Sequence, residues 1–285
     1  MPSQFQKGIN EKKANYKWRD MRLSPIFDPQ KSGRPMRVAA FMSGSGTNII
    51  KLIEKEKALK EQSGTSPFHV VFIFSDRSDG KCRGEKIALD NGIPYISYDI
   101  RAFHNMRGVR RTVATPEGMA ARMEFDSIAA ELVKAYAIDV IALGGYMSFI
   151  TLGRCVNVHP ADLSILTSDG RRKYTGDHAV LDAIMAGEKT LRSSTLWTDK
   201  GVDTGPLLMV SRPVVVELPV PLEELKKDEK GLIEIADLYQ QRLKEAGDWE
   251  IFPRTIEMTA NGRFALDEFN NVYVDGIRVP EGCRE

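Results

Sequence analysis

A carboxamide and an imidazole lie two residues apart in the segment CVNVHP, residues 155–160, at the end of an apolar, β-branched run. Because side chains alternate between the two faces of a strand, Asn157 and His159 are expected on the same face. Pro160 cannot extend a hydrogen-bonded ladder, so the strand should end there. An amide and a titratable imidazole suit holding a carbonyl oxygen while a proton moves nearby. The alternative is a strand end whose polar groups bond to the backbone.

A glycine-rich turn, SGSGTN at residues 43–48, follows the first apolar run. Glycines let a backbone approach a ligand closely, and a helix N-terminus offers free N–H groups and the positive end of a dipole. Together they favour a phosphate site. The turn is neither a P-loop nor a complete dinucleotide fingerprint, because the Gly-Lys-Ser/Thr ending and the third glycine are absent. A plain strand–helix turn capped by Thr47 or Asn48 is the alternative.

A third candidate is a carboxylate, Asp203, in the glycine-flanked loop GVDTGP at residues 201–206. On a constrained turn it could orient a histidine and assist proton transfer, or it could form an Asx turn. His178, in YTGDH at residues 174–178, is typical of a loop histidine. The sequence contains no HExxH, GxSxG or EF-hand pattern, and its histidines, cysteines and carboxylates lack ligand spacing. No metal site is predicted.

Composition narrows the class of protein. The chain has 285 residues, of which 42% are hydrophobic and 28% charged, and a net charge of +1. This balance gives no overall field that would attract nucleic acid or an anionic membrane. The three cysteines are far apart, which fits a reducing compartment, and no apolar run approaches the ~20 residues that span a bilayer. No secretory signal core is present at the N-terminus. We expect a soluble cytoplasmic protein without nucleic-acid or membrane partners.

The elements that must position these side chains alternate along the chain. Apolar runs predict strands at 37–42, 68–75, 94–98, 139–143, 155–159, 194–198 and 207–216. Helical spacing predicts helices from 49 onward and at 82–91, 119–137, 180–186, 222–246 and 249–258. Ile128 is expected on the buried stripe of the 119–137 helix. Residues 99–118 are rich in arginine, show no clear period and are predicted to be an irregular insertion. Residues 264–266 and 272–274 should form a hairpin.

This alternation favours an α/β fold with an open, mostly parallel twisted sheet and helices on both faces. Ligands bind at the carboxyl ends of the strands in such sheets. The 43–48 turn and the end of the 155–159 strand would both lie on that edge. Residues 1–36 are polar and basic and contain four aromatic residues. They are predicted to be an extension that serves as a solvated tail or a contact in a homodimer, with a nucleic-acid arm as the alternative.

Five short motifs occur in order: SGSGTN at 43–48, GGYM at 144–147, NVHP at 157–160, YTGDH at 174–178 and VDTGP at 202–206. With them the chain resembles the phosphoribosylglycinamide formyltransferases, folate-dependent enzymes of purine biosynthesis with a Rossmann-like fold. The resemblance covers roughly residues 37–265, with a phosphate-binding N-terminal half and a folate-binding C-terminal half. It leaves residues 1–36 as the extension and 266–285 as a C-terminal hairpin and tail.

The resemblance implies that a formyl group passes from 10-formyltetrahydrofolate, the co-substrate, to the primary amine of glycinamide ribonucleotide, without a metal. Asn157 and His159 would stabilise the tetrahedral oxyanion, while Asp203 would hold the protonation state of the histidine and shuttle a proton. The residues implied to hold the substrate phosphate are Ser45, Gly46, Thr47 and Asn48. The residues implied to contact folate are Arg122, Tyr146, Met147, Ser148, Phe149, Ile150 and Asn157.

Several positions depart from the family's pattern. Ser148 stands in place of an arginine, Asp177 of an apolar residue, Val180 of a second histidine and Arg192 of a glycine. Candidates for further substrate contacts are His178, Glu245 and Asp248, the last two in place of a glutamine and a glutamate. A negative charge at Glu245 would sit poorly beside a phosphate. Other readings therefore stay open: a formyltransferase for another small amine, a formyltetrahydrofolate hydrolase, or an inactive nucleotide-binding module.

Overall fold

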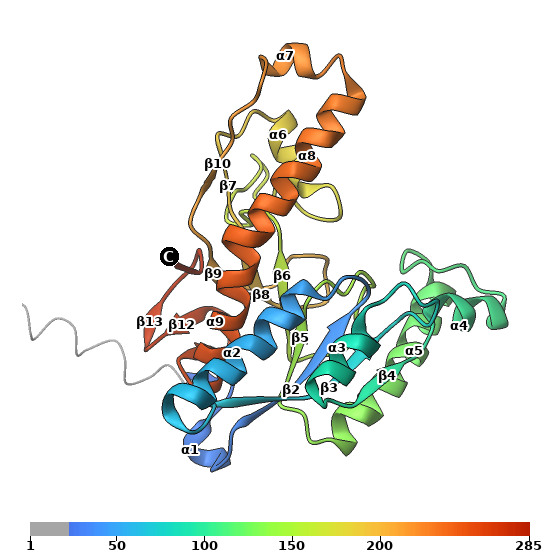
Figure 1. The fold of residues 1–285 in the computed structure, drawn as a ribbon, viewed down its shortest axis with the longest axis vertical. Helices are drawn as coiled ribbons and strands as arrows, with labels where there is room; N and C mark the ends of the chain where they lie inside the picture. Colours follow the sequence, from blue (N-terminus) through green and yellow to red (C-terminus); the bar gives the residue numbers. More distant parts are fainter. Residues whose placement is uncertain (1–22) are drawn as a thin grey trace, which may run out of the picture.

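The computed structural model describes residues 23–285. Its centre is an eight-stranded sheet in the order β14-β9-β8-β6-β5-β2-β3-β4 (Figure 1). Five adjacent strands are parallel: β2 (Met36–Met42), β3 (Phe68–Ser75), β4 (Tyr95–Ser97), β5 (Val140–Leu143) and β6 (Cys155–His159). Beyond β6 the sheet turns antiparallel through β8 (Ser194–Trp197) and β9 (Leu207–Val210), and β14 (Cys283–Arg284) closes that edge. The predicted mostly parallel α/β sheet is confirmed.

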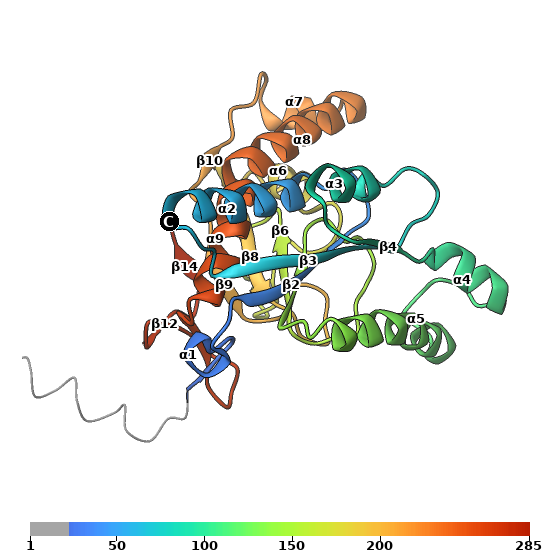
Figure 2. The same cartoon turned by 60° about the horizontal axis from the view of Figure 1, so that its bottom comes forward.

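Helices cover both faces of this sheet, as predicted. Figure 2 shows α2 (Thr47–Ser63) and α3 (Gly84–Asn91) on one side and α5 (Pro116–Ala135) on the other. Strand β2 contributes side chains to the cores on both faces of the sheet. Val38 and Ala40 belong to the apolar cluster under α2, and Ala39 and Phe41 belong to the one under α5. Helix α9 (Trp249–Ala260) packs beside α2, through Ile251, Phe252 and Ile256. The parallel strands therefore read as continuous apolar runs, since both faces are buried.

A third apolar cluster includes Leu196 of β8 and Val210 of β9, and most of its other members belong to the elements in the upper part of Figure 1. It is formed around α6 (Ala179–Met185), β7 (Thr190–Leu191), β10 (Val214–Val215), α7 (Leu222–Leu225) and α8 (Glu229–Leu243). The helix predicted at 222–246 is broken between α7 and α8, where the Asp228 side chain accepts a hydrogen bond from the Gly231 amide and starts a new helix. A π-helical turn, η1 (Lys244–Asp248), joins α8 to α9.

The predicted irregular insertion at 99–118 is wrong. Helix α4 (Ile100–Arg107) begins at Asp99, whose carboxylate accepts hydrogen bonds from two backbone amides, and ends at Gly108 in the left-handed conformation. Helix α5 begins at Pro116, three residues before the predicted start. Only eight residues long, α4 is too short for a periodic pattern to stand out. Ile128 is also misplaced: it is 39% exposed, and Phe125 and Ala129 face the core instead.

The predicted C-terminal hairpin is confirmed by the antiparallel pair β11 (Phe264–Leu266) and β12 (Val272–Val274). It belongs to a four-stranded sheet with β1 (Ser24–Pro25) and β13 (Ile277–Arg278), and α1 (Pro29–Ser32) follows β1. The strand predicted at 207–216 is split into β9 and β10. Most of the predicted extension, residues 1–22, lies outside the described part of the chain, and the domain limits stay predictions. None of the helices between residues 23 and 285 combines the length and the hydropathy of a membrane-spanning segment.

Candidate active site

The carboxyl end of β6 presents Asn157 and His159 on one face. Their neighbours Val156 and Val158 point the opposite way, into the apolar cluster under α2 and α9. The strand pairs in parallel with β5 and antiparallel with β8, so its register is fixed from both sides. A slip by one residue would send both polar side chains into the core, which makes this register strongly specified.

The loop that carries Asp203 is tightly constrained. Asp203 itself has a positive φ of 54°, an uncommon conformation for a residue with a side chain. A Cβ on Gly205 would lie 2.0 Å from the carbonyl oxygen of Trp197, so only glycine fits there. Arg172 donates a 2.6 Å hydrogen bond to the Gly205 carbonyl, and the Gly176 amide donates one of 3.0 Å to the Asp203 carboxylate. These contacts fix the carboxylate in position.

The three predicted catalytic side chains come together. Asp203 Oδ2 lies 3.4 Å from His159 Nδ1, and Asp203 Oδ1 accepts a 3.5 Å hydrogen bond from Asn157 Nδ2. His159 Nε2 lies 3.2 Å from the carbonyl oxygen of Tyr174. The side chains of His159 and Asp203 are each 9% exposed. The carboxylate thus contacts the imidazole and the amide at once, and the distances are long enough to tighten when a ligand binds.

The protonation of His159 is set by opposing effects. Burial lowers the pKa of the imidazole, and the neighbouring Asp203 charge only partly opposes this. Both ring nitrogens nevertheless face oxygen acceptors, at Tyr174 and Asp203. A second proton on the ring would therefore lie between Nδ1 and the carboxylate, in surroundings that favour its release. Such a histidine is suited to passing a proton on during a reaction.

The glycine-rich turn lies at the same sheet edge, at the end of β2. The Ser43 amide donates a 3.0 Å hydrogen bond to Gly145 at the end of β5. Gly46 precedes α2 at φ 68°, a conformation that strains any side chain, and a Cβ there would also crowd the ends of the Met42 and Ile87 side chains. No side chain caps this helix, contrary to the alternative of a cap by Thr47 or Asn48. Ser45 is exposed, whereas Asn48 is buried.

Asn48 leads to a second buried polar cluster. Its amide donates a 3.4 Å hydrogen bond to Asp248 in η1, and the Ser193 hydroxyl donates one of 2.5 Å to the same carboxylate. Burial raises the pKa of Asp248 to about 6. The other two substrate-contact candidates lie elsewhere: Glu245 is exposed and accepts a hydrogen bond from Gln241, and His178 is exposed at the start of α6. Of the three, the structure places only Asp248 beside the turn.

Replacing Asp248 with asparagine should change how stability depends on pH. Because the folded-state pKa of about 6 exceeds the ordinary value of 3.8, the group favours the folded state fully below pH 3.8 and loses that effect as the pH rises through 6. The wild type should lose about 2 to 3 kcal/mol relative to Asp248→Asn between pH 4 and pH 7. Urea unfolding at several pH values measures this. The control Asp237→Asn changes an exposed carboxylate and should keep the pH dependence of the wild type. If the free energy of unfolding of Asp248→Asn also varied with pH as in the wild type, the prediction would be contradicted.

The segment expected to contact folate, residues 146–150, follows β5 at the same edge. The Met147 amide donates a 2.9 Å hydrogen bond to Ser43, and the Ser148 hydroxyl bonds to Asp76. The Met147 side chain is 66% exposed, whereas Tyr146 and Ile150 are buried, and Phe149 lies between. Only part of this segment is therefore available to a ligand.

Arg122 lies in the interior. It is 2% exposed and donates hydrogen bonds to Asp126 and to the Tyr146 hydroxyl, at 2.6 and 3.0 Å from the same nitrogen. Asp126 in turn accepts a hydrogen bond of 2.7 Å from the Thr151 amide. With so little exposed surface, Arg122 offers folate almost no contact area, and we leave it out of the proposed folate contacts. Its contacts hold the two ends of the 146–151 segment instead.

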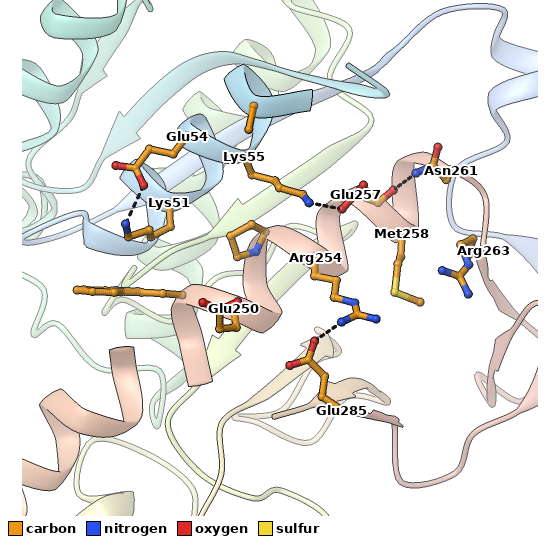
Figure 3. A pocket seen from close by; sticks show the side chains of 13 residues that line it. Lys51, Glu54, Lys55, Glu250, Arg254, Glu257, Met258, Asn261, Arg263 and Glu285 are labelled. Carbon is orange, nitrogen blue, oxygen red and sulfur yellow. Dashed lines mark hydrogen bonds and ion pairs between the residues drawn. The ribbon is translucent and has the colours of Figure 1, made fainter. Parts of the chain in front are cut away.

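A cavity of about 640 Å³ opens elsewhere, between α2 and α9 (Figure 3). Its cations have partners: Lys55 pairs with Glu257 at 2.9 Å and Arg254 with Glu285 at 2.6 Å. None of the predicted site residues lines it. Within residues 23–285, no group of three or more histidine, cysteine or carboxylate side chains is arranged to hold a metal ion. The convergent polar groups at the sheet edge remain the candidate site.

A family model described as formyl transferase matches residues 36–228. The chain belongs to the formyl transferase family. This formyl transferase is 24% identical to the phosphoribosylglycinamide formyltransferase of Haemophilus influenzae, over 86% of this chain and 96% of that protein. It is 29% identical to the trifunctional purine biosynthetic protein adenosine-3 of Drosophila melanogaster over 81% of this chain, but spans only 14% of that protein.

The fold of this formyl transferase is also found in a solved structure. The phosphoribosylglycinamide formyltransferase of Coxiella burnetii, in complex with CHES, superimposes with a TM-score of 0.60 at 23% identity. The match covers 88% of this chain and 99% of that one. At this level of identity the likeness establishes the fold.

Sequence reasoning missed several residues that support the site. Ser193 anchors Asp248, and Gly247 allows the approach, because a Cβ there would lie 2.5 Å from the Ser193 hydroxyl. Tyr174 and Gly176 act through backbone groups, which no side-chain pattern reveals. The YTGDH motif predicts a loop histidine, whereas in the structure its backbone at Tyr174 and Gly176 contacts the site. The one sequence feature that indicates the Ser193 contact is Gly247 next to Asp248, because a glycine permits another segment to approach closely.

Proposed function

We propose that this chain transfers a formyl group from 10-formyltetrahydrofolate to the primary amine of glycinamide ribonucleotide. The observation that carries the proposal is the convergence of Asn157, His159 and Asp203 from β6 and a separate constrained loop. Acyl transfer to an amine needs a donor for the developing oxyanion and a group that accepts and returns protons. These three side chains supply both at the end of the strand.

Each residue has a distinct part in this proposal. Asn157 has two amide hydrogens, so it can donate one to Asp203 and the other to the formyl oxygen. His159, when protonated, places a positive charge beside that oxygen as negative charge develops there. Asp203 receives the proton released by the attacking amine, through the histidine or a water molecule, and returns it to the departing folate nitrogen. Atoms and charge balance without a metal.

The two substrates would lie on either side of this trio. The amino terminus of α2, with Ser45, Gly46 and Thr47, faces the phosphate, and the buried Asn48–Asp248 pair offers polar groups to the rest of the nucleotide. The 146–150 segment would hold the folate through its backbone and the exposed Met147 side chain. The fit of folate rests on that exposed side chain and on the 2.9 Å bond that ties the segment to Ser43.

The decisive experiment is a purified assay with 10-formyltetrahydrofolate, in which formylated product and free formate are both measured. Formylated glycinamide ribonucleotide, appearing only when that amine is present, is the expected result. Formate release that does not depend on the amine would identify a hydrolase instead. Folate binding with neither product would identify an inactive binding module, and transfer only to another small amine would overturn the acceptor.

A further inference from the structure

A short hairpin at residues 165–173 follows β6 and brings a fourth charged side chain to the active site. Leu166 and Arg172 form an antiparallel bridge within it. Because side chains alternate along an extended segment, Arg171 and Lys173 are exposed whereas Arg172 is half-buried. The hairpin therefore turns the side chain of Arg172 away from solvent.

The Arg172 guanidinium reaches the loop that carries Asp203. Its Nη2 atom donates a hydrogen bond of 2.6 Å to the carbonyl of Gly205, two residues after Asp203. Its Nη1 atom is buried and, within residues 23–285, has no hydrogen-bond partner. A buried charged donor without a partner is costly and calls for a functional reason. Because Nη1 is shielded from solvent, Arg172 is better placed to act on its protein neighbours than on a ligand.

The charge of Arg172 acts on two of the three catalytic side chains. Burial lowers the pKa of Arg172, and the charges of Asp203 and Asp199 only partly oppose this. A guanidinium keeps its proton in proteins, so Arg172 stays positive. Burial also lowers the pKa of His159, and the charge of Arg172 lowers it further. The charges of Asp203 and Asp177 oppose this change, so three charged groups act on the imidazole from separate segments.

We propose that Arg172 is a positioning residue for the reaction, which holds the Asp203 loop against His159 and keeps a fixed positive charge beside the imidazole. This inference rests on the proposed function. Asp203 has a positive φ of 54°, a conformation that persists only where the surroundings hold it, and the bond to Gly205 supplies part of that restraint. The fixed charge makes the imidazolium a stronger acid, which favours transfer of its proton to the departing folate nitrogen as the carbon–nitrogen bond breaks.

Three substitutions of Arg172 separate its hydrogen bond from its charge. Arg172→Lys keeps the charge and a donor, Arg172→Gln keeps a donor without the charge, and Arg172→Met removes both. Arg171→Gln is the matched control, because this neighbouring side chain is 82% exposed and pairs with Asp169 at 2.6 Å. Solvent screens an exposed charge, so its loss should affect His159 little.

The first measurement does not depend on catalysis. The Cε1 protons of the four histidines are titrated by NMR in the unliganded protein, and the His159 signal is assigned by its loss in His159→Gln. The pKa of His159 should rise in Arg172→Gln and stay close to that of the wild type in Arg172→Lys and Arg171→Gln. An unchanged or lowered pKa in Arg172→Gln, or an equal rise in Arg171→Gln, would overturn the fixed charge.

The second measurement is formyl transfer over a range of pH. Because imidazolium persists to higher pH when the pKa of His159 rises, the alkaline limb of kcat/KM should move to higher pH in Arg172→Gln. Asp203→Asn removes the opposite charge and should move it to lower pH. Arg172→Met should also lose about 10- to 100-fold in kcat at nearly unchanged KM, because the loop is less well held. Arg172→Lys should recover most of this loss.

The outcomes separate this proposal from the proposed function. Wild-type kcat in Arg172→Met, or a change confined to KM, would overturn the positioning role. If Arg172→Met does not fold, the comparison of Arg172→Gln with Arg172→Lys still decides the role of the charge, since both variants keep a donor for Gly205. A wild type without formyl transfer would overturn the proposed function, and the NMR titration would still decide whether Arg172 sets the charge of His159.

Discussion

Replacing Asn157 with alanine should lower kcat for formyl transfer by about 10² to 10³-fold, with a small change in KM. Asn157 lies on a strand whose register is fixed by β5 and β8, so its amide is held in place before the substrate arrives. A donor held in this way stabilises the oxyanion without reorganisation when charge develops. Rapid-mixing or steady-state assays at saturating substrate measure the loss directly.

The conservative variant Asn157→Asp tests whether the hydrogen bond or the side-chain volume matters. It keeps the size of the side chain, removes the donor and sets a carboxylate 3.5 Å from Asp203, where the two negative charges repel. Its activity should fall at least as far as that of Asn157→Ala. Full activity in either variant, with unchanged thermal unfolding, would remove Asn157 from the proposed mechanism.

Replacing Asp203 with asparagine should lower kcat by about 10² to 10⁴-fold. Asp203 raises the pKa of His159 against the lowering effect of burial. Without this charge the pKa of His159 falls further, so less imidazolium is present at neutral pH, and the proton acceptor is lost as well. The alkaline limb of the pH profile of kcat/KM, where the imidazolium is lost, should move to lower pH in the variant.

Asp177→Asn is the matched control for this prediction. Asp177 also raises the pKa of His159, but more weakly than Asp203, and its side chain is exposed. Its loss should shift the pH profile slightly in the same direction and leave kcat within a few-fold of the wild type, because solvent screens an exposed charge. If Asp177→Asn and Asp203→Asn lowered kcat equally, the loss would come from removing a negative charge near His159, and Asp203 would have no specific part in proton transfer.

The parts of the site that could be predicted from sequence are those with a short-range signature. The alternation along β6 placed Asn157 and His159 on one face, because a strand has a period of two. The glycines at 44 and 46 marked a close turn before α2. The alternating elements predicted the sheet and the edge at which both segments meet, because parallel strands end together. The pairing of Asp203 with these residues came from family resemblance, and the structure gives it a distance of 3.4 Å.

The parts that could not be predicted depend on tertiary contacts. Ser193 meets Asp248 across 55 residues, and the contact requires the close approach of Gly247, which no local pattern encodes. Helix α4 owes its start to one capping aspartate, and its eight residues include both Arg107 and the buried His104. The charged residues of this short segment leave too few apolar positions for a helical period to be recognised. The folate candidates included Arg122, whose burial follows from contacts with Asp126 and Tyr146 that appear only in three dimensions.

The contact between Asn48 and Asp248 joins residues that are 200 positions apart. At about 5 to 20 residues per second, a ribosome needs roughly 10 to 40 s to reach the second residue after the first has been made. The early strands and α2 can assemble during that interval, but the polar end of α2 has no partner until η1 emerges. A nascent chain would thus form the parallel part of its sheet, from β2 to β6, well before Asn48 and Asp248 can meet.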